Sequence, residues 1–420
     1  MPLPLLALLA CAPDATDTKD TGPLTDLDPT CDGDPSEVSL ARTPTWDDVA
    51  PILGASCTGC HVTDGIGPFA LDTWEDASAM AGAVAASTEA RRMPPWGPAP
   101  CDSCQPFAHD PSLTDVEIAT LRAWADAGAP SGVTERAPLA EAPTLDRVDV
   151  TVASATPYTP PETVDDVYRC VVLDAPSDTA TFLTGYEVLP DNAAILHHVV
   201  MTVVKDEATE AAVDALDAAD PGAGWNCFAT GDGSLETLFA WAPGQGAVTF
   251  PEGTGLALPA GRRLVAQMHY NTRGGTGPDQ TAVALRLDDA VTFPAIMAHL
   301  SNRELVLPPG EAATSVEQSQ VIPAALDGVR VWGLMPHMHQ TGSAFSLRAT
   351  QAGSDTCLMD VPRWDFNWQG FYLYESPVTL RTGDELTMGC TFDTRGRTET
   401  TVFGEGTDDE MCMAFVYVSR

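Results

Sequence analysis

The sequence predicts a multidomain protein in which one small all-α domain precedes two all-β sandwiches. The chain has 420 residues, which exceeds one ordinary domain and allows each of several domains to bury its own core. Helix-start patterns lie in the first third, whereas short β-branched runs between turn signals recur beyond Pro138. A total of 35 Pro and 34 Gly favours many turns and short strands over long helices.

The chain is strongly acidic, with 21 Lys+Arg against 59 Asp+Glu and a net charge of −38. Phosphate binding requires basic patches, so we expect no nucleic-acid partner. The same balance disfavours electrostatic attraction to anionic lipid, so membrane contact is expected through a lipid anchor only.

The N-terminal region carries an export pattern. Its apolar run ends in Leu8-Leu9-Ala10-Cys11, which resembles a bacterial lipobox with an acylated Cys, although no basic residue precedes it. A merely hydrophobic N-terminus is the alternative. Residues 12–37 are acidic with little to bury, which predicts a disordered tether. The whole chain has eleven cysteines, which is typical of a protein in an oxidising compartment. Together with the pattern in residues 1–11, this predicts a lipoprotein of the bacterial cell envelope, in the periplasm or on the outer surface.

The first folded domain is predicted over residues 38–135 and begins with a helix. The run Thr45-Trp46-Asp47-Asp48 is typical of a helix start, and apolar spacing continues the helix into Cys57-Thr58-Gly59-Cys60-His61. The C-x-x-C-H pattern is the attachment signal of haem c: Cys57 and Cys60 bond to the haem, and His61 ligates its iron. A redox dithiol and half of a zinc site are the alternatives. A dithiol does not need the His, and zinc would need two more ligands.

Met93 is the predicted second axial ligand of that haem. It lies in Arg92-Met93-Pro94-Pro95-Trp96, where the prolines favour an extended loop that can hold a thioether against the haem. A Met simply buried in a loop is the alternative interpretation, and His109 is the competing ligand.

A second helix start follows at Thr114-Asp115-Val116-Glu117, and Gly128 and Pro130 are expected to end that helix. With the C-x-x-C-H pattern and Met93, this region resembles a small class I-like cytochrome c domain. Further cysteines in the N-terminal part are expected to form a loop disulfide between Cys101 and Cys104, or a bond from one of them to Cys31.

The larger part of the chain has the strand spacing of antiparallel sandwiches. About 275 residues suggest two sandwiches, residues 145–295 and 296–420, joined near Phe293–Asn302, with a helical insertion at Glu207–Ala219. The predicted strand runs are Tyr168–Leu173, Ile195–Val204, Leu264–Tyr270, Val283–Leu287, Val329–Leu334, Phe345–Ala349, Thr387–Phe392 and Ala414–Val418.

Five histidines of this part occur in pairs or near-pairs. Positions i and i+2 of a strand face the same side, so His337 and His339 can reach one metal. Adjacent His197 and His198 would face opposite sides of a regular strand, so a shared metal requires a bulge, a bend or a strand end. A single His such as His269 is ordinarily a core or surface residue, but the grouping favours metal binding.

Here the sequence resembles the copper type II, ascorbate-dependent monooxygenases. The resemblance covers about residues 150–420 and rests on four motifs in order, which are His197-His198, Gln267-x-His269-Tyr270, His337-x-His339 and Asp409-Glu410-Met411-Cys412. It implies two jelly-roll-like β-sandwiches that each bind one copper ion. It also implies Cys390–Cys412 as a disulfide and makes Cys170–Cys227 a plausible second one, while the partner of Cys357 stays open.

The resemblance implies two different ligand sets. The electron-transfer copper would be held by His197, His198 and His269, and the O₂-binding copper by His337, His339 and Met411. The donor chemistry agrees, because imidazole and thioether suit a metal that cycles between Cu(II) and Cu(I), whereas zinc rarely accepts Met.

The expected function is hydroxylation of an activated C–H bond in a small substrate with O₂. Family members usually take electrons from ascorbate, but here the haem domain is expected to relay electrons to copper, and an exported donor is a further expected partner. The peptide-amidating members carry polar or basic residues where this chain has Met335, Met413 and Phe415, so we expect an apolar substrate. The alternatives are a non-catalytic electron-transfer or copper-handling lipoprotein and a structural surface protein.

Overall fold

The computed structural model describes most of the chain beyond the N-terminal region. The predictions for Cys11, Cys31, Trp96, Cys101 and His109 concern residues outside the described part. The described residues are 24, 33–63, 67–95, 97–99, 104–108, 110–140, 143–164, 166–220, 222–227, 235–241, 243, 245–272, 275–366, 368–404 and 408–420.

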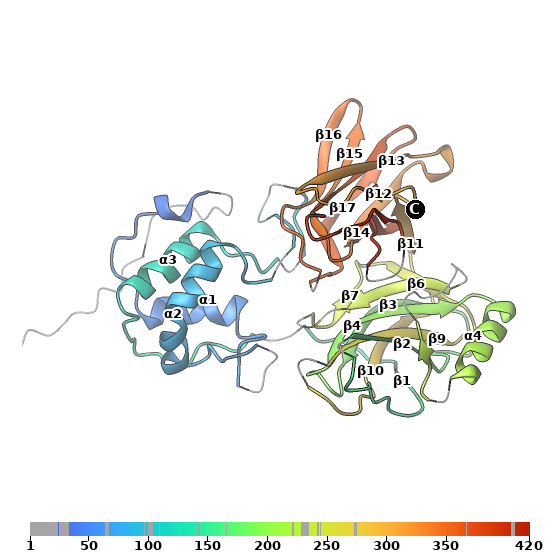
Figure 1. Cartoon of the computed structure of the whole chain (residues 1–420), viewed down its shortest axis with the longest axis horizontal. Helices are drawn as coiled ribbons and strands as arrows, with labels where there is room; N and C mark the ends of the chain where they lie inside the picture. The colour runs from blue at the N-terminus through green and yellow to red at the C-terminus, as the bar shows by residue number, and fades with distance from the viewer. Residues whose placement is uncertain are drawn as a thin grey trace, which may run out of the picture.

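Three α-helices form a helical module ahead of the β part: α1 (Trp46–Ser56), α2 (Trp74–Glu89) and α3 (Asp115–Asp126). The predicted capping boxes at Thr45 and Thr114 are confirmed. The core of the module includes Trp46, Leu53 and Trp124, which are all buried. The module therefore has an apolar core of its own, and its three helices lie together beside the β part (Figure 1).

The predicted continuation of the first helix into the C-x-x-C-H pattern is wrong. Helix α1 ends at Ser56 because the backbone N–H groups of Cys57 and Thr58 both donate to the carbonyl of Leu53, at 2.8 and 2.9 Å, which closes the last helical turn. The pattern lies in the turns that follow, and the N–H of His61 donates to the carbonyl of Cys57 at 2.9 Å.

The rest of the chain consists mainly of β-sandwiches, as predicted, and each of the eight predicted runs overlaps a strand. The insertion Glu207–Ala219 is a helix, α4. The strands of the first half are β1 (Val150–Ala153), β2 (Asp166–Leu173), β3 (Thr181–Leu189), β4 (Leu196–Val204), β5 (Trp225–Asn226), β6 (Leu235–Trp241), β7 (Val248–Thr249), β8 (Thr254–Leu258), β9 (Leu264–Asn271) and β10 (Ala282–Asp288). Those of the second half are β11 (Phe293–Ser301), β12 (Val306–Leu307), β13 (Thr314–Val321), β14 (Val329–His337), β15 (Gly342–Gln351), β16 (Ser354–Val361), β17 (Tyr372–Leu380), β18 (Glu385–Phe392), β19 (Thr401–Val402) and β20 (Met413–Ser419).

One nine-stranded sheet runs through both sandwiches (Figure 1). Its order is β1-β10-β3-β8-β11-β20-β14-β17, with β7 also paired to β3. In the first sandwich it packs against the sheet β5-β2-β9-β4-β6, and in the second against β13-β18-β15-β16. Strand β11 pairs in parallel with β8, so the backbone ladder continues from one sandwich into the other.

The chain between α2 and α3 is fastened to the second sandwich. Cys104 forms a disulfide with Cys357, 253 residues later in the sequence. The expected loop disulfide between Cys101 and Cys104 is therefore wrong, because tertiary packing brings Cys104 beside β16. Phe107 pairs with Tyr374 and is buried in the core of the second sandwich.

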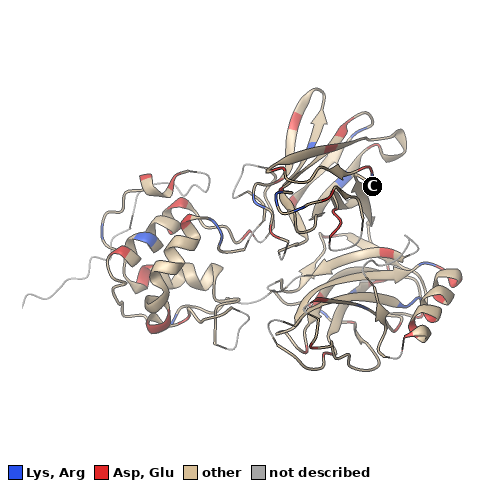
Figure 2. Ribbon diagram, in the orientation of Figure 1, with Lys and Arg blue, Asp and Glu red and all other residues tan. Residues whose placement is uncertain are grey.

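The surface reflects the composition, and acidic residues occur on the helical module and on both sandwiches (Figure 2). The three described disulfides fit an oxidising compartment. Among the described residues, no helix has the length and apolar character required to cross a membrane.

Candidate metal centre

Three histidines converge on neighbouring strands of the first sandwich, and we refer to His197, His198 and His269 as the three-histidine site. His197 and His198 lie on β4, and His269 lies on β9 directly opposite His198. The pairing of these strands shifts register between Leu196 and His198. The predicted need for an irregularity is confirmed, since it lets two adjacent side chains reach the same side of the strand.

The Nδ1 atoms of this site form a close triangle. They are 3.4 Å apart between His197 and His198, 3.1 Å between His197 and His269, and 3.2 Å between His198 and His269. Three nitrogens that each lie about 2.0 Å from one metal ion in tetrahedral geometry are about 3.3 Å apart. Among the described residues, this is the one group of three or more His, Cys, Asp or Glu whose ligand atoms converge closely enough to hold a metal.

Groups around the triangle fix the orientation of its rings. Asp166 accepts a hydrogen bond from Nε2 of His269 at 3.0 Å, which leaves the Nδ1 lone pair directed at the other histidines. The ring of Tyr168 stacks on His269, with centroids 4.1 Å apart and planes 3° from parallel. The side chain of Gln267 forms a hydrogen bond with His198. The site is therefore organised by the protein itself.

Burial favours the neutral form of two of these rings, those of His198 and His269. Burial, followed by the neighbouring His197, lowers the pKa of His269 to about 4. Burial also lowers the pKa of His198 well below its usual value, with smaller effects from His269, His197 and His337. A neutral imidazole is the form that binds a metal, so the rings are ready to ligate near pH 7.

The second candidate centre, the H-x-H site, comprises His337, His339 and Met411. His337 ends β14, and the ring centroid of His339 lies 5.3 Å from that of His337. Nδ1 of His337 contacts Oε1 of Gln369 at 2.6 Å, and Nδ1 of His339 contacts the carbonyl of Asp409 at 3.0 Å. With Nδ1 hydrogen-bonded in both rings, Nε2 is the nitrogen left for a metal. Burial, then His339, lowers the pKa of His337 to about 4.

A buried carboxylate holds the parts of the H-x-H site together. Glu410 is fully buried and accepts from the backbone N–H groups of His339 at 2.9 Å, Thr341 at 2.6 Å and Met411 at 3.3 Å. The hydroxyl of Thr341 donates to the same side chain at 2.8 Å. Met411 is itself buried, and the predicted Cys390–Cys412 disulfide, which is confirmed, fastens the next residue to β18. Cys170–Cys227 is confirmed as well.

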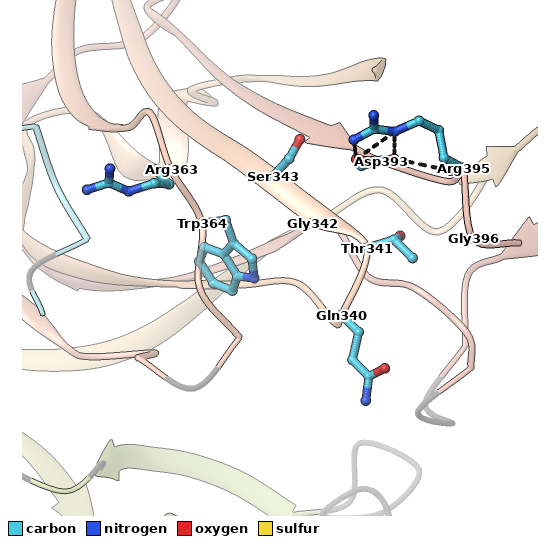
Figure 3. A pocket seen from close by; sticks show the side chains of 9 residues that line it. All are labelled: Gln340, Thr341, Gly342, Ser343, Arg363, Trp364, Asp393, Arg395 and Gly396. Atoms are coloured by element: carbon cyan, nitrogen blue, oxygen red, sulfur yellow. Dashed lines mark hydrogen bonds and ion pairs between the residues drawn. The ribbon is translucent and has the colours of Figure 1, made fainter. Parts of the chain in front are cut away.

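The hollow beside the H-x-H loop is polar, with a volume of about 710 Å³ (Figure 3). Gln340, Thr341 and Ser343 line it, together with the indole of Trp364. Both of its arginines have partners: Arg395 pairs with Asp393, which also lines the hollow, and Arg363 donates to backbone carbonyls of the helical module. The hollow therefore presents polar side chains together with two arginines that already have hydrogen-bond partners.

Contacts within the C-x-x-C-H turn and the segment after it orient the ring of His61. Nδ1 of His61 lies 3.0 Å from the carbonyl of Phe69, which as a hydrogen bond would leave Nε2 for a metal. A Cβ on Gly67 would lie 2.7 Å from that Nδ1, so only glycine fits against the ring. Cys57 and Cys60 are free thiols, and burial raises the pKa of Cys57 to about 12. A redox dithiol needs the opposite shift.

Met93 lies in the segment that follows α2. It is 38% exposed and lines a cavity between the helical module and the second sandwich.

Several residues that shape these sites were missed by sequence reasoning. They are Asp166, Tyr168, Gln369 and Glu410, and each acts on a predicted ligand through a hydrogen bond or a ring contact. Glu410 had a sequence signal, since it is a charged residue just before the apolar run of β20. Gln369 had none, because it lies 32 residues from His337 in an irregular segment.

The comparisons with known proteins found one family model and several curated relatives. Residues 295–418 match the family model "Copper type II ascorbate-dependent monooxygenase, C-terminal domain". The chain is 25% identical over 296 residues to tyramine beta-hydroxylase of Caenorhabditis briggsae, covering 64% of this chain and 48% of that protein. It is 27% identical over 195 residues to dopamine beta-hydroxylase of Canis lupus familiaris, covering 43% and 31%. It is 26% identical over 264 residues to peptidylglycine alpha-amidating monooxygenase of Rattus norvegicus, covering 60% and 25%. The chain thus spans less than half the length of these relatives.

Proposed function

We propose that this protein is a copper-dependent monooxygenase that hydroxylates an activated C–H bond of a small, apolar substrate with O₂. The observation that carries the proposal is the convergence of three imidazole nitrogens at 3.1–3.4 Å within a chain whose residues 295–418 match a copper monooxygenase domain. The names of the three relatives are those of hydroxylases and a monooxygenase, which supports the reaction class.

In this proposal the two candidate centres have different roles, one in electron transfer and one in the reaction with O₂. Bound copper would supply one-electron redox chemistry and a place for O₂ to react. The three-histidine site would hold an electron-storing copper within its triangle of imidazole nitrogens. The H-x-H site, with His337, His339 and the thioether of Met411, would hold the copper at which O₂ reacts, since a soft ligand favours Cu(I).

The substrate would meet an apolar environment near the H-x-H site. Met413 pairs with His337 across β20 and β14, and Phe415 pairs with Met335 two positions earlier. Met335 and Met413 are buried. These residues offer no cation for a substrate carboxylate, which argues for an uncharged, apolar substrate rather than a peptide C-terminus.

The helical module would contribute a haem c bound through Cys57 and Cys60, with His61 and Met93 as axial ligands. The contact of His61 with the Phe69 carbonyl supports that assignment. The haem would supply one-electron transfer toward copper, with ascorbate or an exported protein as the original donor. Anchoring of the chain to the cell envelope through acylated Cys11 completes the proposal.

Oxygen consumption by the copper-loaded full-length protein tests this function. We expect uptake of O₂ with ascorbate and a panel of apolar substrates that contain benzylic or allylic C–H bonds, and formation of a hydroxylated product. His339→Ala should abolish product formation and leave the three-histidine site loaded. Copper binding at both sites without turnover of any substrate would instead indicate an electron-transfer or copper-handling protein.

A further inference from the structure

Two edge strands of the second sandwich lie beside the chain that connects α2 and α3. Strand β16 ends the sheet β13-β18-β15-β16, and β17 ends the nine-stranded sheet. We refer to residues 97–99 and 104–108 of this connection as the strap. The strap forms backbone hydrogen bonds with both edge strands, so it joins the two sheets of the sandwich along one side.

The strap is fastened to β16 by a covalent bond and by hydrogen bonds. Cys104 forms the disulfide with Cys357. The N–H of Ala99 donates to the carbonyl of Asp360 at 2.6 Å, and the side-chain amide of Gln105 donates to the carbonyl of Cys357 at 3.3 Å. Both described pieces of the strap are thus tied to the same strand.

On β17 the strap forms a short antiparallel bridge and adds a side chain to the core. Phe107 pairs with Tyr374, and the N–H of Ala108 donates to the carbonyl of Leu373 at 2.8 Å. The side chain of Phe107 is buried, and its ring meets that of Tyr372 edge-on with centroids 5.8 Å apart. The strap therefore packs directly against the aromatic side chains of β17.

Tyr372 connects the strap to the turn that carries Gln369. Its buried hydroxyl accepts hydrogen bonds from the backbone N–H groups of Gly370 and Gly97. A Cβ on Gly97 would lie 3.0 Å from this oxygen, which shows how closely the strap approaches it. One hydroxyl thus holds a residue of the helical module and the residue next to Gln369.

The amide of Gln369 is held at both of its polar atoms. Its Nε2 donates to the carbonyl of Phe366 at 2.9 Å, which makes Oε1 the acceptor that faces Nδ1 of His337 at 2.6 Å. Nδ1 of His337 then carries the proton, and Nε2 is left for a metal. A chain of contacts therefore runs from the strap through Tyr372 to His337.

We propose that the strap and Tyr372 are positioning elements of the H-x-H site, which act through the turn of Gln369 to set the orientation of His337. This inference rests on the copper sites of the proposed function, and it requires no cofactor in the helical module. The three-histidine site lies on β4 and β9 of the first sandwich, so a change in the strap should leave copper binding there unchanged.

Copper affinity of the full-length protein tests this role with two matched variants. Tyr372→Phe keeps the ring and removes the acceptor of the Gly370 N–H, whereas Tyr374→Phe removes a buried hydroxyl that donates to the carbonyl of Leu358 at 3.0 Å. Both are made in His269→Ala protein, where the H-x-H site alone binds copper. We expect Tyr372→Phe to weaken Cu(I) binding about tenfold and Tyr374→Phe to leave it near the value of the parent protein. Equal affinities in the two variants would overturn the proposal.

The metal-free protein gives a second readout, which does not depend on copper. With isotope-labelled histidine, the Nδ1–H of His337 should give a magnetic resonance signal that its hydrogen bond to Gln369 protects from exchange with water. We expect this signal in the wild type and in Tyr374→Phe, and its loss in Tyr372→Phe. An unchanged signal in Tyr372→Phe would overturn the positioning role. The expected pattern in a protein that binds no copper would support the positioning of His337 and contradict the proposed function.

Cys104→Ser combined with Cys357→Ser tests the strap itself, because it removes the covalent bond to β16. We expect copper affinity at the H-x-H site to fall, as in Tyr372→Phe. The three-histidine site, measured in His339→Ala protein, should keep its affinity. Equal loss of affinity at both centres, or no loss at either, would overturn the role of the strap.

Discussion

The two histidine centres are built in opposite ways. In the three-histidine site the Nδ1 atoms point inward, and Nε2 of His269 is held from outside by Asp166. In the H-x-H site Nδ1 of both rings points outward, to Gln369 and to the Asp409 carbonyl, which leaves Nε2 for the metal. The first centre is assembled by paired strands, and the second by a loop that a buried carboxylate holds. We infer that the geometry of the H-x-H site depends more on the residues around its ligands than the geometry of the three-histidine site does.

The largest expected effect of a supporting residue is at Glu410. Glu410→Ala would leave the buried N–H groups of His339 and Thr341 without their acceptor, and each unpaired group costs about 1–3 kcal/mol. We expect loss of copper from the H-x-H site and normal copper at the three-histidine site, measured as copper per chain. Glu317→Gln, at a largely exposed side chain, is the control. Equal loss from both centres would contradict a local role.

Gln369 should have the next largest effect. Gln369→Leu keeps the size of the side chain and removes the contact with His337, so copper affinity at the H-x-H site should fall about 10–100-fold. Competition with a Cu(I) chelator would measure it in His269→Ala protein, where the H-x-H site alone binds copper. An unchanged affinity would show that the ring of His337 is oriented by other contacts.

Substitution of Asp166, which supports the three-histidine site, should lower copper affinity less than substitution of Gln369 does. Asp166 is 44% exposed in its side chain, so water can replace part of its hydrogen bond to His269. Asp166→Ala should weaken copper binding at the three-histidine site by about tenfold at most, and Asp166→Asn, which retains an acceptor oxygen, by less. The same chelator competition in His339→Ala protein measures both. A loss as large as that of Gln369→Leu would contradict the comparison between the centres.

The smallest expected effect concerns acid stability of the metal-free protein. The pKa of His269 is about 4 in the folded chain, below its ordinary value of 6.5, because burial disfavours the charged ring. Between those values the unfolded chain binds more protons than the folded one, so stability should fall as pH decreases from about 6.5 to about 4. Urea titrations at several pH values measure this slope. In His269→Gln the slope should be shallower, and an identical slope would exclude His269 as its source.

The sequence predicts which histidines lie together better than it predicts the residues that contact them. His197 and His198 could be recognised with the bulge they require, because adjacent positions of a regular strand face opposite sides. The helix at Glu207–Ala219 and its bounds were predictable from composition. Contacts such as Gln369 with His337, or Cys104 with Cys357, depend on tertiary packing and leave no local pattern.

Two kinds of secondary structure escaped prediction for physical reasons. Helix α2 is rich in Ala and lacks the spaced large apolar residues that mark a buried helix face. Strand β13 lies at the edge of its sheet and is largely exposed and polar, so it does not show the alternation of a half-buried strand. Core strands such as β9, which is almost entirely buried, were predicted because apolar runs of this kind are distinctive.

The number and kind of metal ions per chain test the central claim most directly. We predict two copper ions in the copper-loaded full-length protein, one in His269→Ala and one in His339→Ala, with different electron paramagnetic resonance spectra for the two single-site variants. A chain that binds zinc alone under copper-replete conditions, or that loses both copper ions in each variant, would contradict the account of two separate copper centres.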